Sequence, residues 1–191
     1  MTAALEHPIG PHTVEDWLAA DQSADGGRLE LIWGYWVASP TASGPHQYAS
    51  DELRMAIKDA LRAAGRSDLY AVTAIATKIS TALRTGLIPD VAVLNSRPIG
   101  VSFPPEALEL VVEVWSPGNT RSERDTKMAA YAGAGVPFLW TVDQAETSVV
   151  LTTYRLESGR YVRDLRAGTG ERVRITAAPV PVEVGLDDLL P

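Results

Sequence analysis

The chain has 191 residues, of which 46% are hydrophobic and 21% are charged, and it contains no cysteine, which excludes disulfides, thiolate metal sites and cysteine nucleophiles. Its formal net charge of −7, from 17 Lys and Arg against 24 Asp and Glu, argues against a protein that coats nucleic acid through a general basic surface. No apolar run approaches the roughly 20 residues of a membrane helix, and the start lacks the pattern of an export signal. We therefore expect a cytoplasmic protein without a membrane span.

The first part of the chain predicts a short helix, a strand pair and a long helix. Thr13-Val14-Glu15-Asp16 has the spacing of a capping box, and the segment 21–27 (DQSADGG) ends the short helix. Arg28–Ala38 alternates strand formers around Gly34, which predicts a hairpin or a bulged strand pair. The amphipathic spacing from His46 to Ala64 predicts one long helix.

The middle of the chain predicts strands around a second helix. Leu69–Thr81 is rich in Val, Ile and Thr and predicts one strand or two, and Leu87–Leu94 predicts another. A strand over Leu108–Trp115 is then followed by a helix from about Ser122 to Ala134 and by a strand over Pro137–Val142.

The last part predicts a β-rich C-terminal extension over residues 146–191. Interleaved strands and helices predict one α/β (α+β) domain over residues 10–191, with a mixed sheet, a core at about 10–145 and a tail at 1–9. The strands expected in the extension are Thr147–Tyr154, Arg160–Leu165 and short ones near Val173 and Val180.

Two apolar strands carry carboxylates. Asp90 is the charged residue of LIPDVAVL, and Glu113 lies in LELVVEVW on the face of Glu109 and Val111. If the two strands pair, the carboxylates come close together, and their repulsion is relieved by a divalent cation or by a raised pKa. The alternative is that each acid caps a loop or pairs with an arginine.

Lys127 lies on the predicted second helix, 14 residues after Glu113. Tyr131 and Ala134 fall on the same stripe of that helix, which is the stripe expected to face the sheet. The alternative is a solvent-exposed Glu123–Lys127 pair at i, i+4. Spacing alone leaves both arrangements open.

An ordered set of short motifs extends over the chain. The motifs are Leu29-Glu30-Leu31-Ile32-x-Gly34, the loop SPTASGPHQ before the long helix, Pro89-Asp90, Glu113-Val114-Trp115-Ser116-Pro117, Asp125-x-Lys127-x-x-x-Tyr131, and GVPFLWTVD over residues 135–143. Taken together, the set resembles the Uma-type restriction endonuclease family of the PD-(D/E)xK nuclease superfamily, over roughly residues 10–145.

The resemblance implies a restriction endonuclease-like fold, in which a mixed central sheet flanked by helices holds a divalent-cation site at its strand ends. In this arrangement carboxylates bind Mg²⁺ or Mn²⁺, and a lysine orients the attacking water or stabilises charge on the phosphate. The implied metal ligands are Asp90 and Glu113, the implied catalytic residues are Asp90, Glu113, Lys127 and Glu30, and the supporting residues are His46 and Tyr131.

Some positions depart from the simplest pattern of the superfamily. The position two residues after Glu113, where many members have lysine, is Trp115, so the ammonium group must come from the following helix. Glu30 could instead be a strand carboxylate that faces solvent, and His46 could be a local helix cap.

The leading hypothesis is a Mg²⁺- or Mn²⁺-dependent endonuclease that hydrolyses phosphodiester bonds in DNA. The alternative is a catalytically silent nuclease-fold protein that binds or scaffolds together with a protein partner. We also expect a homodimer, because the Arg-rich C-terminal part and the aromatic residues of Leu31–Trp36 are of the types that favour interfaces.

Overall fold

The structure is a computed structural model that describes residues 9–20, 28–39, 41–116 and 118–191. The predicted tail up to residue 8, the break at 21–27 and Pro117 of the Glu113 motif lie outside the described residues. The helices are α1 (Val14–Ala19), α2 (Gly44–Ala63) and α3 (Arg121–Gly133), with 3₁₀ turns η1 (Pro105–Ala107) and η2 (Asp187–Leu189). Within the described residues, no helix combines the length and the apolar character needed to span a membrane.

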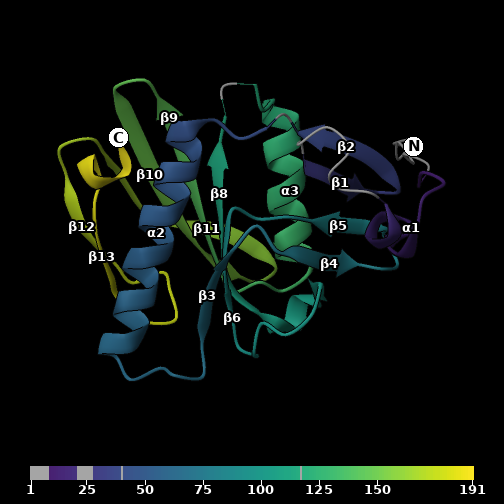
Figure 1. Cartoon of the computed structure of the whole chain (residues 1–191), viewed down its shortest axis with the longest axis horizontal. Helices are drawn as coiled ribbons and strands as arrows, with labels where there is room; N and C mark the ends of the chain where they lie inside the picture. Colours follow the sequence, from purple (N-terminus) through teal and green to yellow (C-terminus); the bar gives the residue numbers. More distant parts are fainter. Residues whose placement is uncertain (1–8, 21–27, 40, 117) are drawn as a thin grey trace.

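The strands form two large sheets and one small sheet (Figure 1). The six-stranded sheet has the order β11-β10-β9-β8-β6-β3, and the five-stranded sheet has the order β2-β1-β5-β4-β7. The small sheet pairs β12 with β13. The strands are β1 (Arg28–Ile32), β2 (Tyr35–Ser39), β3 (Tyr70–Thr73), β4 (Ala76–Ser80), β5 (Thr85–Leu87), β6 (Val91–Leu94), β7 (Ser102–Phe103), β8 (Leu108–Trp115), β9 (Phe138–Ala145), β10 (Ser148–Glu157), β11 (Arg160–Gly168), β12 (Arg172–Ile175) and β13 (Val182–Gly185).

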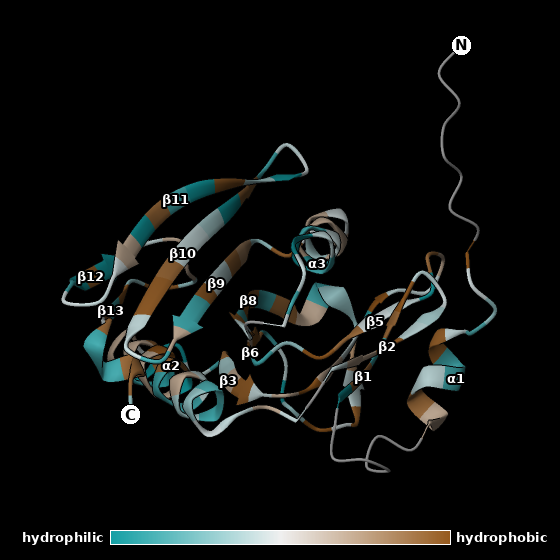
Figure 2. Ribbon diagram, turned by 90° about the horizontal axis from the view of Figure 1, so that it is seen from above, coloured by the Kyte–Doolittle hydropathy of each residue, from teal (hydrophilic) through white to brown (hydrophobic). Residues whose placement is uncertain are grey.

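Helices α2 and α3 cover opposite faces of the six-stranded sheet (Figure 2). Leu53 and Ile57 of α2 belong to the core that contains Val112 and Trp140, whereas Tyr131 of α3 belongs to the core that contains Val111. Strands β8 and β9 are parallel, and α3 is the crossover between them. The buried stripe of α3 therefore packs on the sheet face to which Val111 and every second residue around it in β8 point.

The five-stranded sheet packs beside the six-stranded one and carries α1. Thr13 and Asp16 form the predicted capping box, and the buried Trp17 of α1 donates from Nε1 to the carbonyl of Leu29 at 2.6 Å. The Trp17 ring lies directly over Gly86 of β5, where an added Cβ would stand 2.3 Å from ring carbon Cε3. Glycine at this position therefore allows the helix to approach the sheet.

The predicted mixed sheet with flanking helices is confirmed, but the strand predicted over Leu87–Leu94 is wrong as a single element. Residues 85–87 form β5 in one sheet and residues 91–94 form β6 in the other. Pro89 lies between them, and a proline lacks the N–H that a continuous sheet ladder needs. The apolar run thus connects the two sheets and leaves Asp90 just ahead of β6.

The strands after Ala145 are β-rich, as predicted, and most of their residues extend the six-stranded sheet. β10 pairs with β9 from Ser148 to Arg155, and β11 pairs with β10 as the outer strand. The last predicted strand, near Val180, is displaced to β13, which packs with β12 near α2. The sheet that bears the candidate site therefore extends well into the C-terminal part of the chain.

Candidate active site

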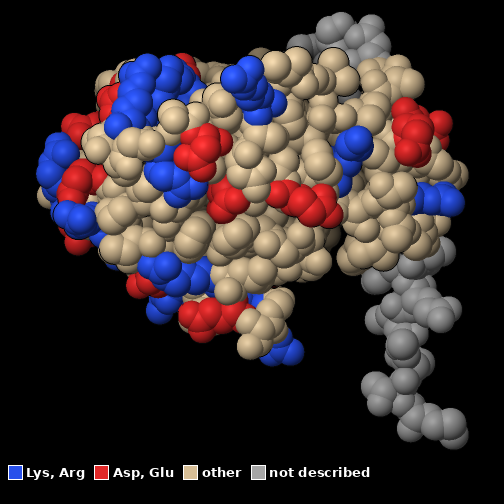
Figure 3. Space-filling model, turned by 90° about the horizontal axis from the view of Figure 1, so that it is seen from below, with Lys and Arg blue, Asp and Glu red and all other residues tan. Residues whose placement is uncertain are grey.

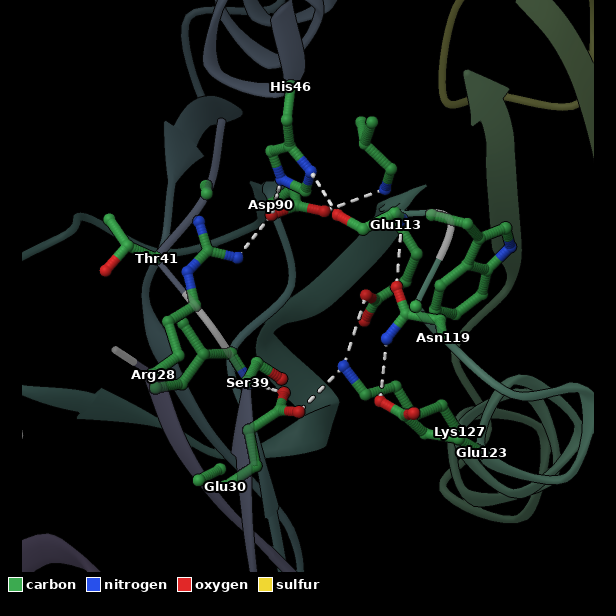
Figure 4. Close-up of a pocket in the computed structure, with 17 residues that line it drawn as sticks. Arg28, Glu30, Ser39, Thr41, His46, Asp90, Glu113, Asn119, Glu123 and Lys127 are labelled. Atoms are coloured by element: carbon green, nitrogen blue, oxygen red, sulfur yellow. Dashed lines mark hydrogen bonds and ion pairs between the residues drawn. The ribbon is translucent and has the colours of Figure 1, made fainter. Parts of the chain in front are cut away.

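Five of the six residues predicted for the site line one pocket of about 240 Å³ (Figure 4), and the sixth, Tyr131, is buried behind Glu113. It lies where β1, the start of α2, the entry to β6, the end of β8 and the inner stripe of α3 meet. Each of these elements contributes a side chain from a different part of the sequence. The pocket is lined by Arg28, Glu30, His46, Asp90, Glu113, Ser116, Asn119, Glu123 and Lys127, among others.

Antiparallel pairing of β6 with β8 brings the two predicted metal-ligating acids together. In the register of this pair, Val91 lies opposite Val112, so Asp90 is beside Glu113 one position further along. Side chains opposite each other in an antiparallel pair have Cβ atoms about 5 Å apart. The pairing expected from the sequence is therefore present.

Asp90 is almost fully buried, and both of its carboxylate oxygens are occupied. Oδ2 accepts a hydrogen bond from the backbone N–H of Val114 at 2.7 Å, and Oδ1 accepts from His46 Nε2 at 2.9 Å. Arg28 also donates to Oδ1 through Nη1. Burial by itself would raise the pKa of Asp90, but the bond from His46 and the charge of Arg28 outweigh it and hold the pKa below its ordinary value.

Glu113 is also buried, and its surroundings stabilise the charged form less well. Oε1 accepts from the hydroxyl of Tyr131 at 2.7 Å, and Oε2 lies 3.4 Å from Lys127 Nζ. Burial raises the pKa of Glu113 to about 7, because the charge of Lys127 only partly offsets it and the charges of Asp90 and Glu30 add to it. Burial and the charge of Glu113 likewise raise the pKa of Tyr131 above its ordinary value.

Lys127 points into the pocket and joins two acids. Its Nζ lies 2.7 Å from Glu30 Oε2 and 3.4 Å from Glu113 Oε2, and the residue is only 5% exposed. Burial would lower the pKa of Lys127, but the charges of Glu113 and Glu30 outweigh it and hold the pKa above its ordinary value. The alternative of a solvent-exposed Glu123–Lys127 pair is wrong, since Glu123 instead accepts from Asn119 Nδ2 at 2.8 Å.

Trp115 lies two residues after Glu113, at the position where the motif resemblance leads one to expect a lysine. Its ring centroid lies 5.9 Å from Lys127 Nζ, within the range of a cation–π contact. Lys127 of α3 thus passes over the Trp115 ring and reaches Glu113. This arrangement agrees with the expectation that the ammonium group comes from α3.

Glu30 is 1% exposed, so the alternative of a strand carboxylate facing solvent is wrong. Its Oε1 accepts from the backbone N–H of Ile88 at 2.8 Å, while Oε2 is the oxygen that meets Lys127. Glu30 comes from the five-stranded sheet, whereas Glu113 comes from the six-stranded one. The pocket therefore assembles across the contact between the sheets.

The alternative of His46 as a local helix cap is wrong, because Ser43 is the N-cap of α2. Ser43 caps α2 by accepting from the backbone N–H of His46 at 3.4 Å, which fixes the imidazole in the first turn of the helix. The ring spans Asp90 Oδ1 and, at 3.5 Å from Nδ1, Ser116 Oγ. Because the ionised Asp90 can only accept, His46 Nε2 carries the hydrogen of this bond.

Arg28, Ser116, Asn119 and Glu123 line the pocket but were not predicted as site residues. Arg28 could have been found, because it lies two residues before Glu30 in β1 and side chains at i and i+2 share one face of a strand. If Glu30 faces the site, Arg28 must face it too. For the other three, the sequence carried no signal beyond their place after the Glu113 strand.

The pocket has more acidic than basic side chains. Arg28 and Lys127 face Glu30, Asp90 and Glu113, so ionisation of all three acids leaves one negative charge without a partner. Burial is the main cause of the raised pKa of Glu113, and the charges of Asp90 and Glu30 add to it. Adjacent carboxylates with uncompensated charge are the hard oxygen donors that Mg²⁺ and Mn²⁺ prefer, so the donor set fits such an ion.

The present arrangement is nevertheless that of an internally paired site. Within residues 9–20, 28–39, 41–116 and 118–191, no three His, Asp or Glu side chains are already gathered as metal ligands. The carboxylate oxygens contact Arg28, His46, Lys127 and Tyr131 instead. An incoming cation would have to replace part of this pairing.

The stability of the protein should depend on pH through Glu113. A carboxyl whose pKa rises from about 4.5 to about 7 on folding is destabilised in the folded state once it ionises. Between these two pH values the folded state binds more protons than the unfolded state, so the free energy of unfolding falls as pH rises. A shift of this size corresponds to at most about 3 kcal/mol.

We therefore expect Glu113→Gln to gain stability relative to the wild type between pH 5 and pH 8, because the amide does not ionise. Urea unfolding of both proteins at the two pH values measures the difference between their free energies of unfolding. Groups that titrate in the same way in both proteins do not contribute to this difference. Glu109→Gln, on the same strand, should show a difference that is constant with pH. A Glu113→Gln difference that is equally constant would contradict the prediction.

A mixed sheet with helices on both faces and an acid- and lysine-lined pocket at its strand ends defines a protein of the restriction endonuclease-like fold class. A family model described as "Uma2: Putative restriction endonuclease" matches residues 14–184, and the chain belongs to this family. The match extends beyond residue 145, where the motif resemblance ended, to include the C-terminal strands.

A solved structure from Anabaena variabilis ATCC 29413, described as a putative nuclease belonging to DUF820, has a similar fold. It is 18% identical in sequence and aligns with a TM-score of 0.69, and the alignment covers 94% of this chain and 97% of that chain. Comparison with curated proteins finds no match. The likeness to the solved structure supports the fold, whereas the roles of the pocket residues rest on their geometry.

Proposed function

We propose that this protein is a Mg²⁺- or Mn²⁺-dependent endonuclease that hydrolyses phosphodiester bonds in DNA. The observation that carries the proposal is the position of Lys127 Nζ between Glu30 and Glu113, beside Asp90, in one pocket. Two adjacent acids with a buried ammonium group are the elements that hydrolytic phosphodiester chemistry requires. Membership of the Uma2 family supports the same reading.

Asp90 and Glu113 would hold the cation, with Glu30 as a third acid. A bound divalent cation supplies a Lewis acid and a water molecule of lowered pKa. Lys127, which is held by Glu30 and Glu113, would place a fixed positive charge next to the phosphate on which negative charge grows. His46 would orient the Asp90 carboxylate through Nε2, and Tyr131 would hold Glu113 in place through its hydroxyl.

The surface charges suggest limited, local contact with DNA. In the view of Figure 3, acidic and basic side chains are interspersed, most densely toward the end formed by α2 and the C-terminal strands, and the opposite end carries fewer side chains of both signs. This face therefore offers no continuous basic track among its described residues, in keeping with the net charge of −7. Specificity would then depend on the pocket and its rim more than on general phosphate attraction.

The direct test is incubation of the full chain with supercoiled, linear, branched and single-stranded DNA, with Mg²⁺ or Mn²⁺ and separately with EDTA. Cleavage of at least one substrate that stops in EDTA is the expected result. Cleavage that is equal in EDTA, or that is absent from every substrate, would contradict the proposal.

A second candidate is a nuclease-fold protein that binds or scaffolds without turnover. The observation that favours it is the internal pairing of Asp90 with Arg28 and His46, which neutralises the site without a metal ion. The two candidates differ in whether the pocket takes up a cation. A scaffold needs no metal ion in this pocket.

Calorimetric titration with Mn²⁺ should therefore show one binding event that Asp90→Asn weakens by about tenfold or more, because a neutral amide replaces a charged ligand. Asp59→Asn is the matched control, since it makes the same charge change at a 73%-exposed side chain paired with Arg62 on α2. If the wild type and both variants bind Mn²⁺ equally well, the ion binds at a site other than this pocket. No binding by the wild type would favour the scaffold.

A further inference from the structure

Arg28 holds the one carboxylate oxygen of Asp90 that is not fixed by the sheet. Asp90 Oδ2 accepts from the backbone N–H of Val114, which belongs to β8 and cannot move without disturbing the strand. Oδ1 faces the pocket and meets the guanidinium of Arg28 and the imidazole of His46. A cation that binds Asp90 through its accessible oxygen must therefore meet Arg28 there.

Of the hydrogen bonds to Asp90, the one from Arg28 is the easiest to break. The Arg28 side chain is 25% exposed, whereas that of Asp90 is 2% exposed and that of His46 is 10% exposed. Arg28 begins β1 and lines the pocket together with Ser39 and Thr41, so its guanidinium reaches Asp90 from the rim of the pocket (Figure 4). It can turn toward the opening without entering a drier environment, which keeps the cost of release low.

We propose that Arg28 is a built-in counter-cation that a divalent cation displaces from Asp90 Oδ1, and that the released guanidinium then contacts a phosphate of the DNA backbone. This inference rests on the proposed function and adds a residue to it. Arg28 keeps the buried Asp90 charge paired while the site is empty of metal ion and substrate. Its planar fork of donors matches the oxygens of a phosphate, which a lysine at the same position would not.

The two parts of the proposal affect binding and turnover in opposite directions. Removal of Arg28 takes away the competitor for Asp90, so the cation should bind more tightly. The same removal takes away a phosphate contact, so DNA cleavage should be slower even when the site is saturated with cation. A residue with a purely structural role would weaken both properties together.

The experiment compares Mn²⁺ affinity by calorimetry, and DNA cleavage at saturating Mn²⁺, for the wild type, Arg28→Met and Arg28→Lys. Arg28→Met should bind Mn²⁺ about tenfold more tightly, because a nearby positive charge no longer competes for the carboxylate, and should cleave DNA about tenfold more slowly. Arg28→Lys keeps the charge but not the fork, so its Mn²⁺ affinity should stay near that of the wild type while its cleavage falls.

Arg62→Met is the matched control, because it removes the same charge from an exposed side chain in the last turn of α2. It should leave Mn²⁺ affinity and cleavage unchanged. Unfolding curves of all the variants check that they are folded. If Arg28→Met is not folded, Arg28→Gln, which also removes the charge but keeps a hydrogen-bond donor for Asp90, takes its place with the same expected results.

Unchanged or weaker Mn²⁺ binding by Arg28→Met would overturn the displacement of Arg28. Wild-type cleavage rates for both Arg28 variants at saturating Mn²⁺ would overturn the phosphate contact. In both cases the proposed function would stand, provided that Asp90→Asn still weakens Mn²⁺ binding. Absence of Mn²⁺ binding in the wild type would instead overturn the proposed function and this inference with it.

Discussion

Glu113→Gln is expected to lower the rate of DNA cleavage by about 10²- to 10³-fold while leaving the protein folded. The substitution removes the charge of a proposed metal ligand from the centre of the pocket, and the amide oxygen can still accept from Tyr131. It also removes a buried charge that has no full partner, so the free energy of unfolding at pH 8 should not fall. The measurement is the initial rate of cleavage at saturating Mg²⁺ or Mn²⁺, together with urea unfolding.

Glu109→Gln is the matched control for this prediction. Glu109 lies on the same strand as Glu113, at a register irregularity of β8, and its carboxylate accepts from Asn95 Nδ2 at 2.8 Å at an exposed site. The same chemical change there should leave cleavage near the wild-type rate. Equal rates for the wild type and Glu113→Gln would remove Glu113 from the mechanism, and equal losses in the two variants would indicate an effect on β8 as a whole.

Lys127→Met is expected to have the largest effect on stability, lowering the free energy of unfolding at pH 8 by about 3 to 5 kcal/mol. The methionine fills a similar volume, but Glu30 and Glu113 are then left as buried acids without the ammonium group that joins them. The loss should be smaller at pH 5, where Glu113 takes up a proton. Urea unfolding at the two pH values measures both effects, and cleavage should be lost at either pH.

The triple variant Lys127→Met, Glu30→Gln, Glu113→Gln tests the physical reason. If unpaired charge causes the loss, the neutral amides should restore most of the stability without restoring cleavage. Lys58→Met, which removes a lysine from the outer part of α2, should change stability by about 0.5 kcal/mol or less. If the triple variant is as unstable as Lys127→Met, the loss of stability comes from the lost packing of the Lys127 side chain and not from unpaired charge.

The sequence predicted the elements whose signals are local. The capping box at Thr13, the amphipathic spacing of α2 and the turn at Gly34 each depend on neighbouring residues, and each element is present close to its expected bounds. The strand over Leu87–Leu94 was wrong because its hydrophobic composition outweighed the single contrary signal of Pro89. The division into two sheets could not be predicted, since it depends on pairings between distant strands.

The site shows the same division between local and distant information. Asp90, Glu113 and Lys127 stood out because charged residues are unusual in apolar strands and on an inward helix stripe, and the ordered motifs linked them. The pairing of Arg28 with Asp90 did not stand out, because it joins residues 62 positions apart. The raised pKa of Glu113 was expected only as one of two ways to relieve repulsion, and its size depends on burial that the sequence does not give.

The contact of Glu30 with both the chain near Ile88 and the amine on α3 has a consequence for how the protein is made. The reactive cluster draws on residues from 28 to 131, and the hydrogen bond of Glu30 alone closes a loop of 58 residues. Such distant closures form late, after local helices and hairpins. A chain truncated before α3 would therefore lack the cluster, because Lys127 and Tyr131 belong to that helix.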